Sequence, residues 1–316
     1  MGAGLLYLAC VLGAWLAMRY VGDRHWLGTV LLLSPRWVLA APLVILWPWA
    51  LVRRSWRAGV VLAGGSVCLL WLVLGVVVSM PRGGDGRSDV RLLTCNIHRQ
   101  NLDADRMATF LDEVKPDIVT LQGWSDVHRD LFQEGWDVRR MGEILVASRF
   151  PIRAEAPMVF EDDPSIPGGE KGAAVVFDVQ TPRGELRLIS LHLASPHMGL
   201  NTMRSDKGRK LETNIARRGY EASEVGRAAA EVRGPLLIAG DFNTVCESPI
   251  FREQLGKLAD AFEARGLGLG YTYVIRTTQI RIDHVLGNGA VRFDRCWVGP
   301  DVGAAHRPLV ADVSIR

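Results

Sequence analysis

Residues 235–248 read PLLIAGDFNTVCES, and they decide how the rest of the chain is interpreted. Four apolar residues bounded by Pro235 and Gly240 are typical of a short buried strand. Asp241 and Asn243 follow two positions apart, so on an extended backbone their side chains point the same way. A carboxylate and an amide at a strand end can take a proton and hold a developing oxyanion, but Gly-Asp-x-Asn is also a common turn sequence.

Composition divides the chain into two parts. Its 316 residues are 48% hydrophobic with a mean hydropathy of +0.12, which indicates a membrane segment followed by one domain. Eight arginines and two acidic residues precede Asp89, whereas the remainder carries 29 basic and 32 acidic residues. A mildly acidic domain lacks the footprint of a general DNA-binding surface, so a lipid headgroup or a small phosphodiester is favoured over long duplex DNA, with a nuclease left open.

Three apolar segments precede the domain. They cover residues 4–18, 37–52 and 58–80. The last has no charge over about 23 residues, enough to cross a hydrocarbon core of about 30 Å. We therefore expect a membrane anchor of three transmembrane helices in residues 1–81, a flexible linker at 82–89 and a folded domain at 90–316.

The orientation of this anchor follows from its arginines. The tight loop that contains Arg53, Arg54 and Arg57 is the densest basic cluster and favours the cytoplasmic side. This prediction makes the protein a multi-pass membrane protein with the C-terminal domain outside the cell. The first loop, between the apolar segments 4–18 and 37–52, also contains arginines, Arg24 and Arg36 among them, and these favour the reverse orientation.

Other apolar runs in residues 90–316 carry polar residues in the same way. Each is a predicted strand with Asn, Asp or His in it or just after it. These residues are Asn96, His192, Asp241 with Asn243, Asp283 with His284, and His306. A lone histidine in an apolar strand is more often structural, but the repetition predicts one shared site. In-line attack on a phosphodiester needs a base, donors to the nonbridging oxygens and a cation.

In these motifs the sequence resembles the endonuclease/exonuclease/phosphatase superfamily, the DNase I-like group. The resemblance covers nearly all of residues 90–316. The motifs occur in order as LLTCNIH, DIVTLQGW, ILVASRFPI, LISLHLASP, LLIAGDFNT, RIDHVL and AAHRPLVAD. The apolar segments ahead of them resemble those of bacterial membrane-anchored members. The resemblance implies an α/β fold, a four-layer sandwich of two mixed β-sheets flanked by helices, and a metal-dependent phosphodiesterase or phosphatase-type hydrolase.

The resemblance also implies a role for each catalytic candidate. Asp241 corresponds to the residue that orients or deprotonates the attacking water, with Asn243 as its partner on the phosphate. His306 corresponds to the residue that binds the scissile phosphate, and Asp283 orients it. His192 corresponds to a second phosphate contact or a general acid.

The metal side of the expected site departs from the family pattern. Asn96 matches the first metal position, with His98 on the same face. The glutamate of the LQE motif is replaced by Gly123, and the aspartate of the SDH motif by Ala305. Mg²⁺, or Mn²⁺ in its place, binds through carboxylates, so the site is expected to be weakened or altered. Three residues are candidates to replace the lost carboxylates: Asp126, Glu143 and His98.

Three functional hypotheses follow. The first is a membrane-tethered hydrolase of a phosphoester in nucleic acid, a lipid headgroup or a small phosphodiester. The second is a catalytically degenerate member that binds a phosphorylated ligand, because Gly123 and Ala305 replace metal carboxylates. The third, in which the domain is a structural appendage of the membrane spans, leaves the retained buried polar residues without a reason.

Overall fold

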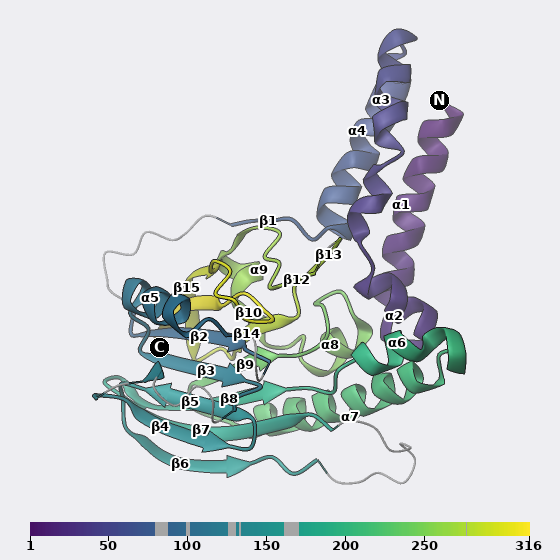
Figure 1. The fold of residues 1–316 in the computed structure, drawn as a ribbon. Helices are drawn as coiled ribbons and strands as arrows, with labels where there is room; N and C mark the ends of the chain where they lie inside the picture. Colours follow the sequence, from purple (N-terminus) through teal and green to yellow (C-terminus); the bar gives the residue numbers. More distant parts are fainter. Residues whose placement is uncertain (80–87, 99–101, 126–130, 133, 161–170, 276) are drawn as a thin grey trace.

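The computed structural model describes residues 1–79, 88–98, 102–125, 131–132, 134–160, 171–275 and 277–316. The C-terminal domain has the four layers that the sequence predicts (Figure 1). Two six-stranded sheets face each other, with helix α5 (Ala104–Val114) outside one and helix α7 (Arg209–Glu231) outside the other. The predicted fold class is therefore confirmed.

Both sheets are mixed. The first has the strand order β15-β16-β2-β3-β5-β4 and the second β10-β14-β9-β8-β7-β6. β2 runs parallel to β3, and β8 to β9, because a helical crossover joins each pair; the other pairs in both sheets are antiparallel. The first sheet contains β2 (Val90–Asn96), β3 (Ile118–Gln122), β4 (Asp137–Met141), β5 (Ile144–Ser148), β15 (Val291–Val298) and β16 (Leu309–Ile315). The second contains β6 (Ile152–Pro157), β7 (Ala173–Thr181), β8 (Gly184–His192), β9 (Leu236–Asp241), β10 (Ala259–Asp260) and β14 (Asp283–Gly287).

Apolar burial holds these layers together. Side chains of both sheets, Phe177 among them, form the core between the sheets. Met107 packs α5 on the first sheet, and Val225 packs α7 on the second. Short elements complete the domain: α6 (His197–Asp206), α8 (Pro249–Gln254), α9 (Ala261–Arg265), β11 (Leu267–Gly268), β12 (Tyr273–Ile275) and β13 (Thr278–Ile280).

The N-terminal part consists of apolar helices that extend from one side of the sandwich (Figure 1). They are α1 (Gly2–Tyr20), α2 (Trp26–Leu33), α3 (Leu43–Val52) and α4 (Trp56–Cys68), with short helical turns at η1 (Gly22–Arg24), η2 (Arg36–Ala40) and η3 (Leu69–Val73). Among the described residues, two helices are long and apolar enough to cross a membrane, α1 and the continuous segment Trp56–Val73. The helical segments Trp26–Leu33 and Arg36–Val52 meet at a bend of 79°, and they form a third candidate span if the bent pair crosses the membrane as one unit. The number of candidate spans is therefore two or three.

The last apolar segment differs from the expected single span over residues 58–80. Its helix ends at Val73, and Gly75 then adopts a φ of +68°. β1 (Val77–Val78) pairs with β11 of the domain instead of continuing the helix. Hydropathy could not locate this break, because the residues on both sides of it are apolar. Of the expected linker, residues 82–87 lie outside the described part of the chain.

Candidate active site

Three of the predicted residues form one row across the second sheet. His192 at the end of β8 is in register with Asp241 at the end of β9, and Asp241 is in register with Asp283 at the start of β14. Gly240 permits this close approach, because its φ is +145° and a Cβ there would lie 1.9 Å from the Leu191 carbonyl oxygen. The row therefore holds an imidazole and two carboxylates side by side.

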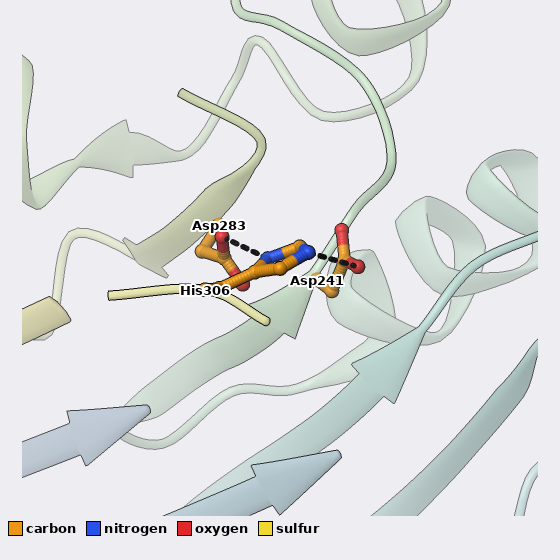
Figure 2. A group of neighbouring side chains, drawn as sticks. All are labelled: Asp241, Asp283 and His306. Atoms are coloured by element: carbon orange, nitrogen blue, oxygen red, sulfur yellow. Dashed lines mark hydrogen bonds and ion pairs between the residues drawn. The ribbon is translucent and has the colours of Figure 1, made fainter. Parts of the chain in front are cut away.

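His306 reaches this row from the segment before β16, in the other sheet. Its backbone N–H donates to the carbonyl oxygen of Asn96 at 3.2 Å. Its ring atom Nδ1 lies 2.7 Å from Asp283 Oδ2, and Nε2 lies 3.8 Å from Asp241 Oδ2 (Figure 2). The buried His306 imidazole is thus enclosed between two carboxylates.

The charges in this cluster shift its protonation equilibria. Burial alone would lower the pKa of His306, but the charges of Asp283 and Asp241 and the Asp283 hydrogen bond outweigh burial and raise this pKa to about 9. The pKa of Asp241 is raised, first by burial and then by Asp283, against the opposing charges of His306 and His192. His306 therefore carries a proton at neutral pH, and Asp241 is a stronger base than an exposed aspartate.

Asn96 and His192 complete the cluster. Asn96 Nδ2 donates to Asp241 Oδ2 at 2.8 Å and lies 3.5 Å from His192 Nε2. On the other side of the ring, His192 Nδ1 lies 2.8 Å from Glu143 Oε1. Burial lowers the pKa of His192, yet the Glu143 hydrogen bond and the Asp241 charge raise it overall. Glu143, expected from the sequence only as a replacement metal ligand, therefore contacts His192 and orients its ring.

Asn243 does not occupy the position that an extended backbone would give it. β9 ends at Asp241, and Asn243 has a φ of +49°. Its backbone N–H donates to Asp241 Oδ1 at 2.8 Å, while its side-chain Nδ2 donates to the Leu193 carbonyl oxygen at 2.8 Å. The expectation that the two side chains share a strand face is wrong, because Asp and Asn here form a turn in which Asn tolerates the left-handed conformation.

The positions expected to bind metal are partly closed. Gly123 has a φ of +68°, and a Cβ added to it would lie 2.9 Å from the backbone nitrogen of His98 and 3.2 Å from Asn96 Oδ1. Asn96 Oδ1 already accepts a hydrogen bond from the His98 N–H at 3.0 Å. The backbone of His98 therefore occupies the space where a side chain at Gly123 would start. Asp126, another replacement candidate, lies outside the described residues.

A different set of residues can hold a divalent cation. Asp241, Asp283 and His306 offer three ligand atoms that all lie within 4.8 Å of one another. Asp283 Oδ1 is buried and has no hydrogen-bond partner among the described residues. Two metal–ligand bonds of about 2.1 Å can span the 3.8 Å between His306 Nε2 and Asp241 Oδ2. These three residues therefore fit a cation, and Oδ1 is the oxygen of Asp283 that is left to bind it, because Oδ2 is engaged by His306 Nδ1.

Sequence reasoning missed Tyr273, which borders the cluster. Its ring centroid lies 5.0 Å from that of His306, in an edge-on arrangement. Tyr273 also packs against the apolar cluster that contains helices of the N-terminal part. The Tyr-Thr-Tyr sequence shortly before the RIDHVL motif was the signal that could have drawn attention to it.

The N-terminal part also contacts the loop that follows Asn243. The Asp23 carboxylate accepts hydrogen bonds from the hydroxyl groups of Thr244 and Ser248 at 3.0 and 2.5 Å. Arg36 donates to Glu247 at 2.6 Å. These partners are more than 200 positions apart in the sequence, so periodicity gave no signal for them.

Comparisons with known proteins identify the family and the fold. The sequence profile described as the Endonuclease/Exonuclease/phosphatase family matches residues 93–314. Among solved structures, an endonuclease/exonuclease/phosphatase from Bacteroides vulgatus is 16% identical, with a TM-score of 0.56, and the match covers 73% of this chain and 100% of that one. A variant of the 3′ phosphatase NExo from Neisseria, bound to product DNA hairpin, is 18% identical, with a TM-score of 0.54 and coverage of 70% and 98%.

A third similar structure is humanized D. rerio TDP2, 15% identical, with a TM-score of 0.52 and coverage of 71% and 98%. These identities establish a shared fold only. No curated protein sequence matches the chain. The profile match covers more than half of the chain and includes every residue of the cluster. The chain is therefore a member of the endonuclease/exonuclease/phosphatase family.

Proposed function

We propose that this protein hydrolyses a phosphoester at the cluster around Asp241. The observation that supports this most directly is the convergence of Asp241, Asp283 and His306, from three separate strands or strand ends, with Asn96 and His192 in contact. The family consists of hydrolases that act on phosphoesters, which supports the coarse activity.

Each residue has a role that its contacts permit. Asp241, with its raised pKa, orients and deprotonates the attacking water. Protonated His306, held by Asp283, stabilises negative charge on the phosphoryl oxygens. His192, held by Glu143, donates a proton to the leaving oxygen. Asn243 forms the turn that fixes Asp241, through its backbone N–H.

Divalent metals are generally used in this family, and Asp241, Asp283 and His306 are the residues that would hold one. A bound cation would supply positive charge for the phosphoryl oxygens. Because one of the three donors is an imidazole nitrogen, the set favours Mn²⁺ over the expected Mg²⁺. The His306 Nε2 proton and a cation would occupy the same place between His306 and Asp241, so protonated His306 supplies the positive charge for the phosphoryl oxygens only without the cation, and the cation would supply it when bound.

The proposal is tested on the full chain in detergent, with bis(p-nitrophenyl) phosphate and p-nitrophenyl phosphate as substrates. Asp241→Asn should lower kcat/KM by about 10²- to 10⁴-fold, because the general base is lost. Asp178→Asn is the matched control, since Asp178 lies in the same sheet but pairs with Arg187 away from the cluster. Equal activity of wild type and Asp241→Asn would refute the proposed role.

The cation preference has its own measurement. Mn²⁺ should bind at least about tenfold more tightly than Mg²⁺, and about one proton should be released per Mn²⁺ at about pH 7.5, because His306 must give up its Nε2 proton. Calorimetric titrations in two buffers of different ionisation enthalpy measure this release. Binding without proton release, or binding unchanged in His306→Gln, would place the cation elsewhere.

A second candidate function is binding of a phosphorylated ligand without turnover. It is favoured by the backbone of His98, which fills the space of a side chain at Gly123, and by Ala305 at the second carboxylate position. This function predicts that inorganic phosphate binds at the cluster while neither substrate is cleaved with Mn²⁺ or Mg²⁺. Any hydrolysis that depends on Asp241 excludes it.

Membrane tethering is also part of the proposal. The domain lies on the same side as the first loop, since Arg24 and Arg36 form ion pairs with Glu253 and Glu247. Their charges are therefore partly compensated, whereas the loop at residues 53–57 is largely exposed at the other end of the helices. This supports the placement of the domain outside the cell. Labelling of a cysteine introduced at Arg153 by an impermeant maleimide in intact cells tests it; a domain inside would stay unlabelled.

A further inference from the structure

A cavity of about 440 Å³ lies apart from the catalytic cluster and shares no residue with it. Ser79, which follows strand β1, and Leu267 of β11 form part of its wall, and strand β15 forms another part. Its walls bring together three arginines and three aromatic side chains. They are Arg265, Arg295, Arg307, Phe262, Tyr271 and Trp297. We call these six residues the arginine pocket.

The positive charge of this pocket is not neutralised within the described part of the protein. No carboxylate is among its described lining residues. The exposed side chains of Arg295 and Arg307 form no hydrogen bond or ion pair with any described residue. Arg295 only stacks on Trp297, 5.2 Å from the ring centroid. The two carboxylates next to Arg295 are engaged by other arginines: Asp294 pairs with Arg292, and the cross-strand neighbour Asp312 pairs with Arg91.

Arg265 is held in place without losing its charge. Its Nε and Nη1 donate to the backbone carbonyl oxygens of Phe293 and Ala264 at 3.1 and 2.7 Å. Carbonyl oxygens fix the guanidinium but leave it a full positive charge. Three guanidinium groups around one cavity repel one another, and an anion with several oxygens relieves this repulsion through bidentate contacts. The aromatic walls suit the apolar or ring portion attached to such an anion.

The pocket lies next to the segment that leaves the membrane helices. β1 begins four residues after the helix ends at Val73. On this two-stranded ribbon Val78 and Leu267 are directly paired, and they are 65% and 74% exposed. An exposed apolar pair beside an arginine cavity matches the boundary between acyl chains and headgroups.

We propose that the arginine pocket binds a phosphate group, as a second site distinct from the catalytic cluster. The phosphate can belong to an anionic lipid of the same membrane or to a soluble phosphate compound. The apolar pair favours the lipid. The site is also close to the catalytic residues along the chain, since Arg307 follows His306 and its N–H is fixed by the Thr272 carbonyl oxygen at 2.8 Å.

The test uses the full chain in dodecyl maltoside micelles, titrated by calorimetry with three probes. The probes are inorganic pyrophosphate, dihexanoyl phosphatidylglycerol and dihexanoyl phosphatidylcholine. The pocket variant is Arg295→Gln/Arg307→Gln, in which neither removed group holds the fold. The charge-matched control is Arg153→Gln/Arg233→Gln, two exposed arginines outside the pocket. An unchanged melting temperature shows that each variant is folded.

Phosphatidylglycerol should bind more tightly than phosphatidylcholine, and the pocket variant should lose this binding by about ten- to a hundredfold while the control retains it. Equal binding of pyrophosphate and phosphatidylglycerol, with both lost in the pocket variant, assigns the site to a soluble phosphate compound. The same loss should appear in a His306→Gln background, where the catalytic cation is absent. If neither anion binds, or if the pocket variant binds both as wild type does, the proposal is overturned.

Discussion

Two buried charged networks contact the loop that follows Asp241, and they differ in how completely their carboxylates are hydrogen-bonded, although Arg218 Nε of the second also has no partner among the described residues. In the catalytic cluster two carboxylates share one imidazole, and Asp283 Oδ1 has no partner among the described residues. At the contact with the N-terminal helices, the Asp23 carboxylate accepts four hydrogen bonds. Their donors are Thr29, Arg218, Thr244 and Ser248.

The difference separates a structural network from a functional one. A buried charge whose bonding positions are filled holds the surrounding elements in one arrangement and has no capacity left for a ligand. A cluster with an unpaired carboxylate oxygen and two carboxylates close together is destabilising by itself and is relieved by a proton or a cation. We infer that the Asp23 network fixes the Thr244–Ser248 side of the loop, so that the cluster with Asp283 and His306 can keep Asp241 in place.

The largest predicted effect is on the Asp23 network. Asp23→Ala should lower the free energy of unfolding by about 3–5 kcal/mol, because the fully buried guanidinium of Arg218 loses its carboxylate. Asp23→Ala/Arg218→Met should recover most of this loss. Thermal and denaturant unfolding of the full chain in detergent measure both variants.

The control for this variant is the exposed pair of Arg24 and Glu253, whose side chains are 58% and 51% exposed. Glu253→Gln should change the free energy of unfolding by less than about 1 kcal/mol. If Asp23→Ala were no worse than Glu253→Gln, the network would not be structural and the comparison between the two networks would fail.

The sequence predicted that His192 and Asp241 would share a site because strand ends follow simple rules. Apolar runs located β8 and β9, and residues after the ends of adjacent parallel strands meet at one sheet edge, which brought His192 and Asp241 together. Asn243 was misplaced, because the change from strand to left-handed turn depends on hydrogen bonds that sequence spacing does not reveal. The contact of Glu143 with His192 and that of Asp23 with Ser248 join distant segments, and only the folded chain shows them.

The second prediction concerns the pH dependence that the unsatisfied network should give. The pKa of His306 is raised to about 9 in the folded protein, whereas an unfolded histidine titrates near 6.5. The folded state therefore holds a proton that the unfolded state releases between these values. The stabilisation by His306 is complete below about pH 6.5 and is lost as the pH rises to about 9.

This loss amounts to at most about 3.4 kcal/mol, since the pKa of His306 falls from about 9 in the folded state to about 6.5 in the unfolded state. Unfolding curves recorded from about pH 6 to about pH 10 without divalent metal should show a larger decline in wild type than in His306→Gln, which keeps only the contribution of His192, whose pKa is also raised. A wild-type profile parallel to that of His306→Gln would mean that the imidazole is not held between charged carboxylates.

The smallest predicted effect tests whether the missing metal carboxylate is excluded by the backbone. Gly123 and Gly142 both have left-handed conformations, with φ of +68° and +63°. A Cβ at Gly142 meets nothing within 4 Å, whereas one at Gly123 meets the His98 backbone nitrogen at 2.9 Å. Gly142→Ala should therefore lower the free energy of unfolding by about 1 kcal/mol, because alanine disfavours the left-handed conformation. Gly123→Ala should lower it by about 2 kcal/mol, since His98 must also shift.

The same contact decides whether a glutamate restored at Gly123 can bind metal. The shift of His98 would break its hydrogen bond to Asn96 Oδ1, the other residue expected at this metal position. Gly123→Glu/Ala305→Asp is thus expected to leave Mg²⁺ affinity within about threefold of wild type in calorimetry, a change worth less than about 1 kcal/mol. A large gain in Mg²⁺ affinity, together with equal costs for Gly123→Ala and Gly142→Ala, would show that the backbone accommodates the carboxylate and that only the side chain was lost.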